Sequence, residues 1–285
     1  MTITLNDYNI LQSRLARVFE IGDGDYGYGQ LALSSQITTA IATTTPFENL
    51  RTDILAALQH QKGVVSRLPI PPVTSSLSDT DWAKYSTTMT LVEQNRLATL
   101  LSSQATAESI ASVSSTSGQW SGTSTHTVNI TFQSDDEMRN YFNTSSAITF
   151  NASRAGGTST AKNIAWTSLL SSIGTVNFRR SATASSKTTG GTQIGYSKLT
   201  EVDQIIFTKA IASAPSNNVY TIMARLDLTT SSIVFTITYT NAGENVTGTL
   251  TSNVGLYRAS GSFVTAATPI VVQAFAVSGP ISKPI

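Results

Sequence analysis

The densest group of side chains that could do chemistry is the acidic run Asp135, Asp136 and Glu137. Two carboxylates that flank a sugar are the catalytic pair of glycoside hydrolases, so this run raises the possibility of a hydrolase. Ser134 followed by Glu137 three residues later, however, is the capping-box pattern of a helix start. Carboxylates in a first helical turn also complement the helix dipole. We therefore interpret the run as a helix start and predict no catalytic role for it.

A second group with chemical potential is the glycine-rich segment 22–29, which contains Asp23 and Asp25. Two aspartates two residues apart resemble the start of a calcium loop, but no downstream glutamate completes one. A phosphate-binding loop would need a preceding strand and a Lys-Ser/Thr pair, and both are missing from this segment. The pattern favours a glycine turn whose two tyrosines, Tyr26 and Tyr28, pack on a neighbour.

The remaining candidates are isolated. His60 lies near the end of a predicted helix, where we expect a partial positive charge to complement the dipole, and His126 lies at the start of a predicted strand. Neither has a second ligand at metal-binding spacing, and the chain has no cysteine. Arg154, Arg179 and Arg180 are interpreted as loop or interface charges. Without a nucleophile elbow, a zinc-protease motif or a Walker loop, we predict no enzyme and no catalytic, cofactor-binding or metal site.

Composition narrows the class of protein further. Charged residues are 12% of the 285, against about 25% in an average domain, and serine and threonine take their place. A net charge of +1 gives no field to attract nucleic acid or an acidic membrane. No run approaches ~18 apolar residues and the N-terminus lacks a signal-peptide pattern, so we expect a protein made in a cytosol without a membrane span. A neutral, hydroxyl-rich surface suits packing against copies of itself or against other subunits.

Residues 1–101 are predicted to be mainly helical. Apolar residues recur at helical spacing over 4–20, over 45–63 and in a third helix that begins at Asp79 or Asp81.

The predicted ends of these helices rest on particular residues. Thr4 or Asn6 is expected to cap the first helix, and Thr45 is expected to cap the second, with Pro46 and Glu48 completing its first turn. Gly63 is predicted to end the second helix. The segment 31–43 is predicted to be an extended arm or a short strand, and the segment 64–78 is predicted to be an extended connector.

The second half of the chain predicts a β domain over 125–285, joined by a Ser/Thr-rich linker over 102–124. The fold class is therefore α+β: a helical N-terminal region followed by a mainly antiparallel β domain with two short helices on the sheet. Within the β domain, residues 127–178 have the clearest pattern, and it predicts the order strand, helix, strand, helix, strand. A long mobile loop is expected over 179–193. Further strands are predicted at 194–199, 203–210, 219–228, 233–240, 246–252 and 270–277, with a hairpin turn at 241–244.

Several segments together carry a resemblance to a known family. They include Phe132-Gln-Ser-Asp-Asp-Glu-Met-Arg-Asn-Tyr-Phe-Asn143, Gly174-Thr-Val-Asn-Phe178, Gly27-Tyr-Gly-Gln30 and Asn49-Leu-Arg-Thr-Asp-Ile54. With these segments the chain resembles virion structural proteins of tailed phages, which are widespread in myoviruses of cyanobacteria and other marine bacteria. The match covers nearly the whole chain and departs from the family at 144–146, where relatives often carry a glycine turn.

The resemblance implies a non-enzymatic virion component of the neck, tail or baseplate, or a fibre adaptor. Such a protein would be made in the host bacterial cytoplasm and would bind copies of itself and other virion proteins. It would have no cofactor, and residues 1–100 would dock onto the particle. The alternative is a receptor- or glycan-binding tail-fibre module in which Trp120, Tyr196 and Tyr257 stack on sugars.

Overall fold

The computed structural model describes residues 3–39, 43–63, 69–73, 77–98, 105–115, 119–211, 217–261, 263–269 and 271–278. It divides the chain into two compact units. We call them the helical unit (Met1–Thr106, Arg139–Ser146 and Arg258–Thr268) and the β unit (Ala107–Met138, Ala147–Tyr257 and Pro269–Ile285). The α+β class predicted from the sequence is confirmed.

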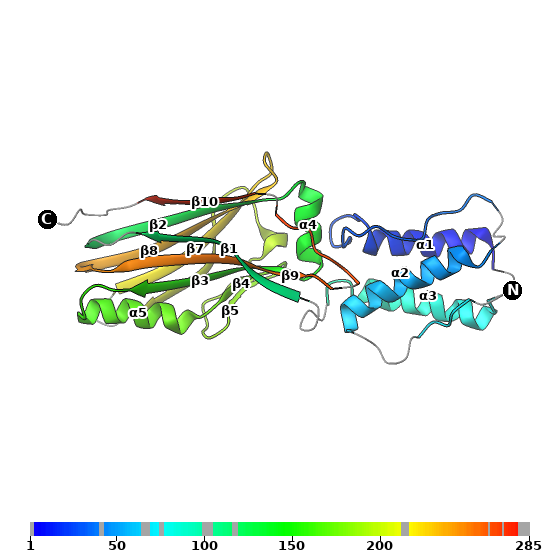
Figure 1. Ribbon diagram of the computed structural model, residues 1–285, viewed down its shortest axis with the longest axis horizontal. Coiled ribbons are helices and arrows are strands. Elements are labelled where there is room, and N and C mark those ends of the chain that lie inside the picture. Colours follow the sequence, from blue (N-terminus) through cyan, green and yellow to red (C-terminus); the bar gives the residue numbers. More distant parts are fainter. Residues whose placement is uncertain are drawn as a thin grey trace. The chain divides into compact units, whose positions relative to one another are not determined.

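The helical unit contains the three predicted helices, α1 (Leu5–Phe19), α2 (Thr45–Lys62) and α3 (Asp79–Gln94), which pack on one another (Figure 1). Their apolar faces form one core, in which Leu15 and Met89 are fully buried. Thr4, one of the two predicted caps, caps α1 and forms a capping box with Asp7. Residues 31–39 form no helix or strand, in agreement with the predicted arm. Residues 40–42, 64–68 and 74–76 lie outside the described part of the chain.

The predicted start of α2 is wrong in its detail. Thr45 is the first helical residue, and the capping position belongs to Thr44, which makes no side-chain capping bond. The Glu48 carboxylate bonds elsewhere, accepting a hydrogen bond from the Val73 backbone N–H. The helix ends as predicted at Gly63, whose φ of 77° is accessible to glycine at little cost.

The β unit is built from two five-stranded sheets of order β1-β9-β3-β4-β5 and β10-β2-β8-β7-β6. The strands are β1 (Ala105–Ser115), β2 (Trp120–Thr131), β3 (Ala147–Ala155), β4 (Val176–Phe178), β5 (Thr183–Ser185), β6 (Gln204–Ile211), β7 (Asn217–Asp227), β8 (Ser232–Val246), β9 (Thr249–Ala259) and β10 (Val271–Ser278). Helix α4 (Asp135–Asn143) follows β2, and α5 (Ala161–Ile173) lies beside β3 (Figure 1).

The two sheets face each other across an aromatic core. Phe235 on β8 packs against Phe150 on β3 and Phe178 on β4, with ring centroids 4.8 and 5.3 Å apart. Burial alternates along β2 and β8, as period-two strands with one face in a core require. The result is a β-sandwich. The predicted order strand, helix, strand, helix, strand is confirmed for 127–178, but β2 belongs to a different sheet from β3 and β4.

Four predictions about the β unit need correction. The linker prediction for 102–124 is wrong because 105–115 and 120–131 are strands. Small hydroxyl residues at the exposed positions of a sheet have the same composition as a linker, so composition alone does not distinguish the two.

The predicted loop at 179–193 is also partly structured, since it contains β5 and Thr183 pairs with Thr192. The strand predicted at 194–199 is a 3-10 turn at Tyr196–Lys198.

The fourth correction concerns the hairpin turn predicted at 241–244. This segment continues β8, because Asn217 pairs with Ala242 on one side and Trp120 pairs with Val246 on the other. Strand β8 ends at Val246, and β9, which begins at Thr249, belongs to the other sheet, so these two strands form no hairpin.

Candidate functional site

The acidic run occupies the first turn of α4, as predicted. The Ser134 Oγ accepts a hydrogen bond from the Glu137 backbone N–H at 3.1 Å, which identifies Ser134 as the cap. Three adjacent residues in one helical turn point in different directions around the axis, so the run does not build the facing pair of carboxylates that glycosidase chemistry needs.

The glycine-rich segment 22–29 is a packed turn of the helical unit. Asp23 and Asp25 form ion pairs with Arg17 (3.1 Å) and Arg96 (3.7 Å). The same two guanidinium groups lie over the Tyr26 ring, 3.8 and 4.2 Å from its centroid. Each aspartate therefore already faces a cation of the protein, and the prediction of a glycine turn with packed tyrosines is confirmed.

His60 differs from the prediction. Its side chain is fully buried and packs edge-on against Tyr28 at 5.0 Å. Burial lowers the pKa of His60 to about 4. The backbone of Thr144 opposes this shift, but no hydrogen bond of normal geometry reaches either ring nitrogen, so burial dominates. At neutral pH the ring is uncharged, and it cannot supply the positive charge that we expected at the end of α2.

His126 lies inside the sandwich, on β2. Its Nδ1 is 2.8 Å from the Ser252 Oγ of β9, and its ring packs edge-on against Tyr239 at 5.2 Å. Burial lowers the pKa of His126 to about 4 as well. This histidine links the two sheets as a neutral hydrogen-bonding group. Among the described residues, no group of three or more His, Asp or Glu side chains could hold a metal ion.

The three aromatic residues of the glycan-binding alternative have different environments. Trp120 is 7% exposed and packs against Trp166 of α5 at 5.4 Å, so it belongs to the core. Tyr196 lies in the 3-10 turn and is half-buried. Tyr257 is also half-buried, but it lines a groove on the β unit.

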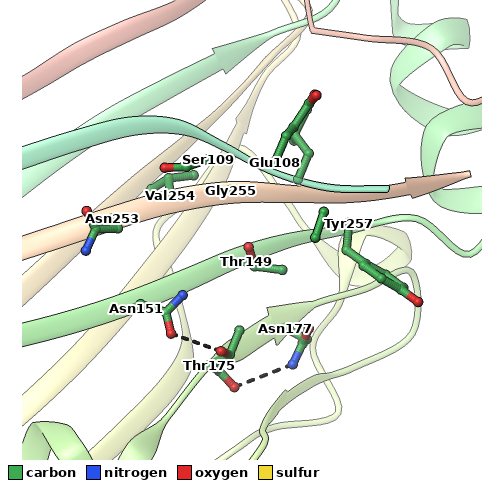
Figure 2. A pocket seen from close by; sticks show the side chains of 12 residues that line it. Glu108, Ser109, Thr149, Asn151, Thr175, Asn177, Asn253, Val254, Gly255 and Tyr257 are labelled. Carbon is green, nitrogen blue, oxygen red and sulfur yellow. Dashed lines mark hydrogen bonds between the residues drawn. The ribbon is translucent and has the colours of Figure 1, made fainter. Parts of the chain in front are cut away.

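The groove has a volume of about 340 Å³ and lies across β1, β9, β3 and β4. The residues that line it belong to these four strands, apart from Thr175, which directly precedes β4. They are Ala107, Glu108, Ser109, Thr149, Asn151, Thr175, Asn177, Asn253, Val254, Gly255, Leu256 and Tyr257. Figure 2 shows Asn253 and Tyr257 on β9, with Asn151 and Thr149 on the neighbouring β3. The volume lies at the lower end of the range for small-ligand pockets.

Gly255 lets the strands on either side of β9 approach closely in the middle of the groove. It lies between Asn253 and Tyr257 on β9 and opposite Thr149 on β3. A Cβ at this position would lie 2.7 Å from the Glu108 carbonyl oxygen and 2.8 Å from the Thr149 Oγ1. A side chain here would therefore collide with β1 and β3, and only glycine leaves the strands and the hollow as they are.

Three asparagine amides supply most of the hydrogen-bonding groups. The Thr175 hydroxyl donates to the Asn151 Oδ1 at 2.9 Å, and the Asn177 Nδ2 donates to the Thr175 carbonyl at 3.4 Å (Figure 2). The part of the chain that the structure describes offers no hydrogen-bond partner to the Asn253 amide or to the Tyr257 hydroxyl. Asn151 and Asn177 are thus oriented through Thr175, and Asn253 can bind a ligand without breaking an internal bond.

The chemistry of the groove is that of binding. An amide offers two donors and one acceptor oxygen, so three amides can bind a ligand that both donates and accepts. Glu108 is the one charged residue among the twelve that line the groove, and the lining contains no histidine, lysine or arginine.

Tyr257 was predicted as a possible sugar-binding residue, whereas the three asparagines and Gly255 were not. A usable signal was present on β3, where Thr149 and Asn151 alternate with buried Ile148 and Phe150 and so lie on the outer face. On β9 the signal was lost because the strand was predicted to end at 252, whereas it extends to Ala259.

Comparison with known proteins gives no assignment: no protein-family model, no curated protein and no solved structure matches this chain. None of the helices in the described residues has the length and apolar character needed to cross a bilayer.

Proposed function

We propose that this chain is a structural component of a tailed-bacteriophage virion, in the neck, tail or baseplate or as a fibre adaptor. It acts by assembly with copies of itself and with other virion proteins, it catalyses no reaction, and it is made in the host bacterial cytoplasm. The sequence resemblance supports this proposal. One structural observation supports the way in which it would assemble.

That observation is the arm of residues 31–37 in the helical unit. Leu31 and Leu33 are 96% and 62% exposed, which is unusual for large apolar side chains that lie two residues apart. The backbone between them and Ile37 is nevertheless held in place. The buried Asp53 carboxylate accepts hydrogen bonds from the Leu33 and Ser34 N–H groups, at 3.1 and 2.7 Å.

A second anchor holds the far end of the arm. The Asn9 side chain donates to the Ile37 carbonyl at 2.8 Å and accepts from the Ile37 N–H at 2.9 Å. Because the backbone is already ordered, a partner that covers the two leucines gains their burial without the cost of ordering the arm. We propose that the arm contacts another virion protein and that residues 1–100 dock the chain onto the particle.

Incorporation of variants into phage particles tests this proposal. The double substitution Leu31→Ser and Leu33→Ser leaves the core intact and should lower the copy number in purified virions several-fold, as measured by quantitative mass spectrometry. Ile164→Ser is the matched control, because Ile164 is a 55% exposed apolar residue of the β unit.

Two results would count against the proposal. Normal incorporation of the double variant would show that the arm does not contact another virion protein. Incorporation of a chain that lacks residues 1–100 would show that the helical unit is not the docking part.

A second candidate function is a receptor- or glycan-binding module of a tail fibre. The specific observation in its favour is the groove, in which an aromatic ring and three amides line one polar hollow on the outer face of a sheet. Binding of the purified protein to host cells tests this candidate, and absence of any binding would refute it.

A further inference from the structure

We propose that the groove on β1, β9, β3 and β4 binds a neutral oligosaccharide, with Asn253 and Tyr257 as its main contacts. This inference rests on the second candidate function and gives it a site and a ligand class. Three properties of the groove lead to it: its charge, the arrangement of its amides and the aromatic ring of Tyr257.

The charge of the groove favours an uncharged ligand. Its twelve lining residues include no lysine, arginine or histidine that could pair with the negative charge of a sialic acid, a uronic acid or a phosphate. The guanidinium carbon of Arg179 lies over the Tyr257 ring at 5.8 Å from the centroid, and Arg179 is not one of the lining residues. The ligand of this groove is therefore polar and uncharged.

The amides match a ligand that carries hydroxyl groups in a row. Asn151 on β3 and Asn253 on β9 are paired in register, so their side chains are separated by about one strand spacing of ~5 Å. Each amide can accept from one hydroxyl and donate to the next, which suits the adjacent hydroxyls of a sugar ring. Asn177 on β4 lies in the adjacent row, where it pairs with Thr149, which in turn pairs with Gly255.

Tyr257 gives the groove its apolar contact. The apolar C–H face of a pyranose packs on an aromatic ring, and the half-buried Tyr257 ring is the only aromatic side chain in the lining. On β9, Gly255 lies between Asn253 and Tyr257 and has no side chain to separate them. A sugar chain that lies along β9 would therefore reach the ring at one end and the amides at the other.

The test is binding of the full-length protein to immobilised oligosaccharides. The set contains neutral glucose, galactose and N-acetylglucosamine oligomers together with their sialylated and phosphorylated counterparts, and intact host cells are assayed in parallel. Binding to at least one neutral oligomer is expected, with little binding to its acidic counterpart. Asn253→Ala and Tyr257→Ala should each weaken that binding about tenfold.

Matched variants separate the groove from the rest of the surface. Asn245→Ala removes an exposed asparagine elsewhere in the β unit and should bind as the parent does. Asn253→Asp keeps the shape but replaces the donor half of the amide with a carboxylate oxygen, and should also weaken binding. Circular dichroism and thermal melts confirm that each variant is folded.

The remaining outcomes would refute the neutral-sugar site, or both that site and the receptor-binding function. Unchanged affinity in folded Asn253→Ala and Tyr257→Ala, or a preference for acidic sugars, refutes the groove as a neutral-sugar site. Binding to host cells without binding to any oligosaccharide refutes this inference but leaves the receptor-binding function standing. Binding to neither cells nor oligosaccharides refutes both.

Discussion

Moderate acid should destabilise this protein through its two histidines. His60 is buried in the core of the helical unit and His126 is buried between the sheets of the β unit. Burial lowers the pKa of each imidazole from 6.5 to about 4. In both units, protonation would place a charged ring where water cannot solvate it, which disfavours the charged form.

The sign of the effect follows from the direction of the shift. A histidine whose pKa is lower in the folded state binds its proton more readily when the chain is unfolded. Its contribution to stability is therefore complete above pH 6.5 and is lost as the pH falls from 6.5 towards 4. When the pH falls from 7 to 5, each histidine should lower the free energy of unfolding by about 2 kcal/mol.

Carboxylates do not explain a loss in this window. The pKa of Asp7 is lowered by the hydrogen bonds of Thr4, and that of Asp81 is lowered mainly by Lys84 and Ser78. A lowered aspartate pKa contributes stability that is lost only below the unfolded value of 3.8. Loss of stability between pH 7 and pH 5 therefore reports on the histidines.

Urea unfolding at pH 7 and pH 5 measures the effect in the parent and in His60→Leu and His126→Leu. Each variant should reduce the loss between the two pH values by about 2 kcal/mol, whatever its stability at pH 7. The comparison of slopes is needed because His126→Leu also removes the hydrogen bond to Ser252. A parent whose stability is the same at both pH values, or variants that retain its full pH dependence, would refute the reasoning.

Three further predictions concern single contacts. Thr4→Ala removes the capping box of α1 and should lower stability by about 1 kcal/mol in urea unfolding, and an unchanged midpoint would contradict the capping role. Phe235→Ala removes the ring between the two sheets and should cost about 3–5 kcal/mol; a loss below about 1 kcal/mol would show that the sheets do not depend on it. Asp53→Asn weakens the anchor of the arm and should speed amide hydrogen exchange at Leu33 and Ser34, whereas unchanged exchange there would mean that Asp53 does not hold the arm.

The sequence was most informative where local rules act alone. Helix α1 could be placed because its start has a cap and its apolar residues recur at helical spacing. Strand β8 could be recognised because Ile233, Phe235, Ile237 and Tyr239 alternate with outward residues. In both elements, burial of one face decides the structure, and that face is written in the local pattern.

Prediction failed where a distant strand decides the local structure. Residues 241–244 have the composition of a turn, yet they continue β8 because Asn217 and Trp120 lie at pairing distance on either side. His60 was expected to be charged because its place near a helix end is visible in the sequence, whereas its burial against Tyr28 is not. Such contacts depend on residues more than twenty positions away.

The groove combines both situations, which explains why only Tyr257 was identified in advance. The outward positions on β3 follow from alternation, but the groove needs the register that places Asn151 beside Asn253 and Gly255 beside Thr149. A shift of one residue between β3 and β9 would turn the β9 side chains to the opposite face and remove the hollow. The buried partners of these strands, such as Phe150 and Val254, hold that register by their own packing. The polar site on the outside of the sheet is therefore specified by the apolar residues on its inside.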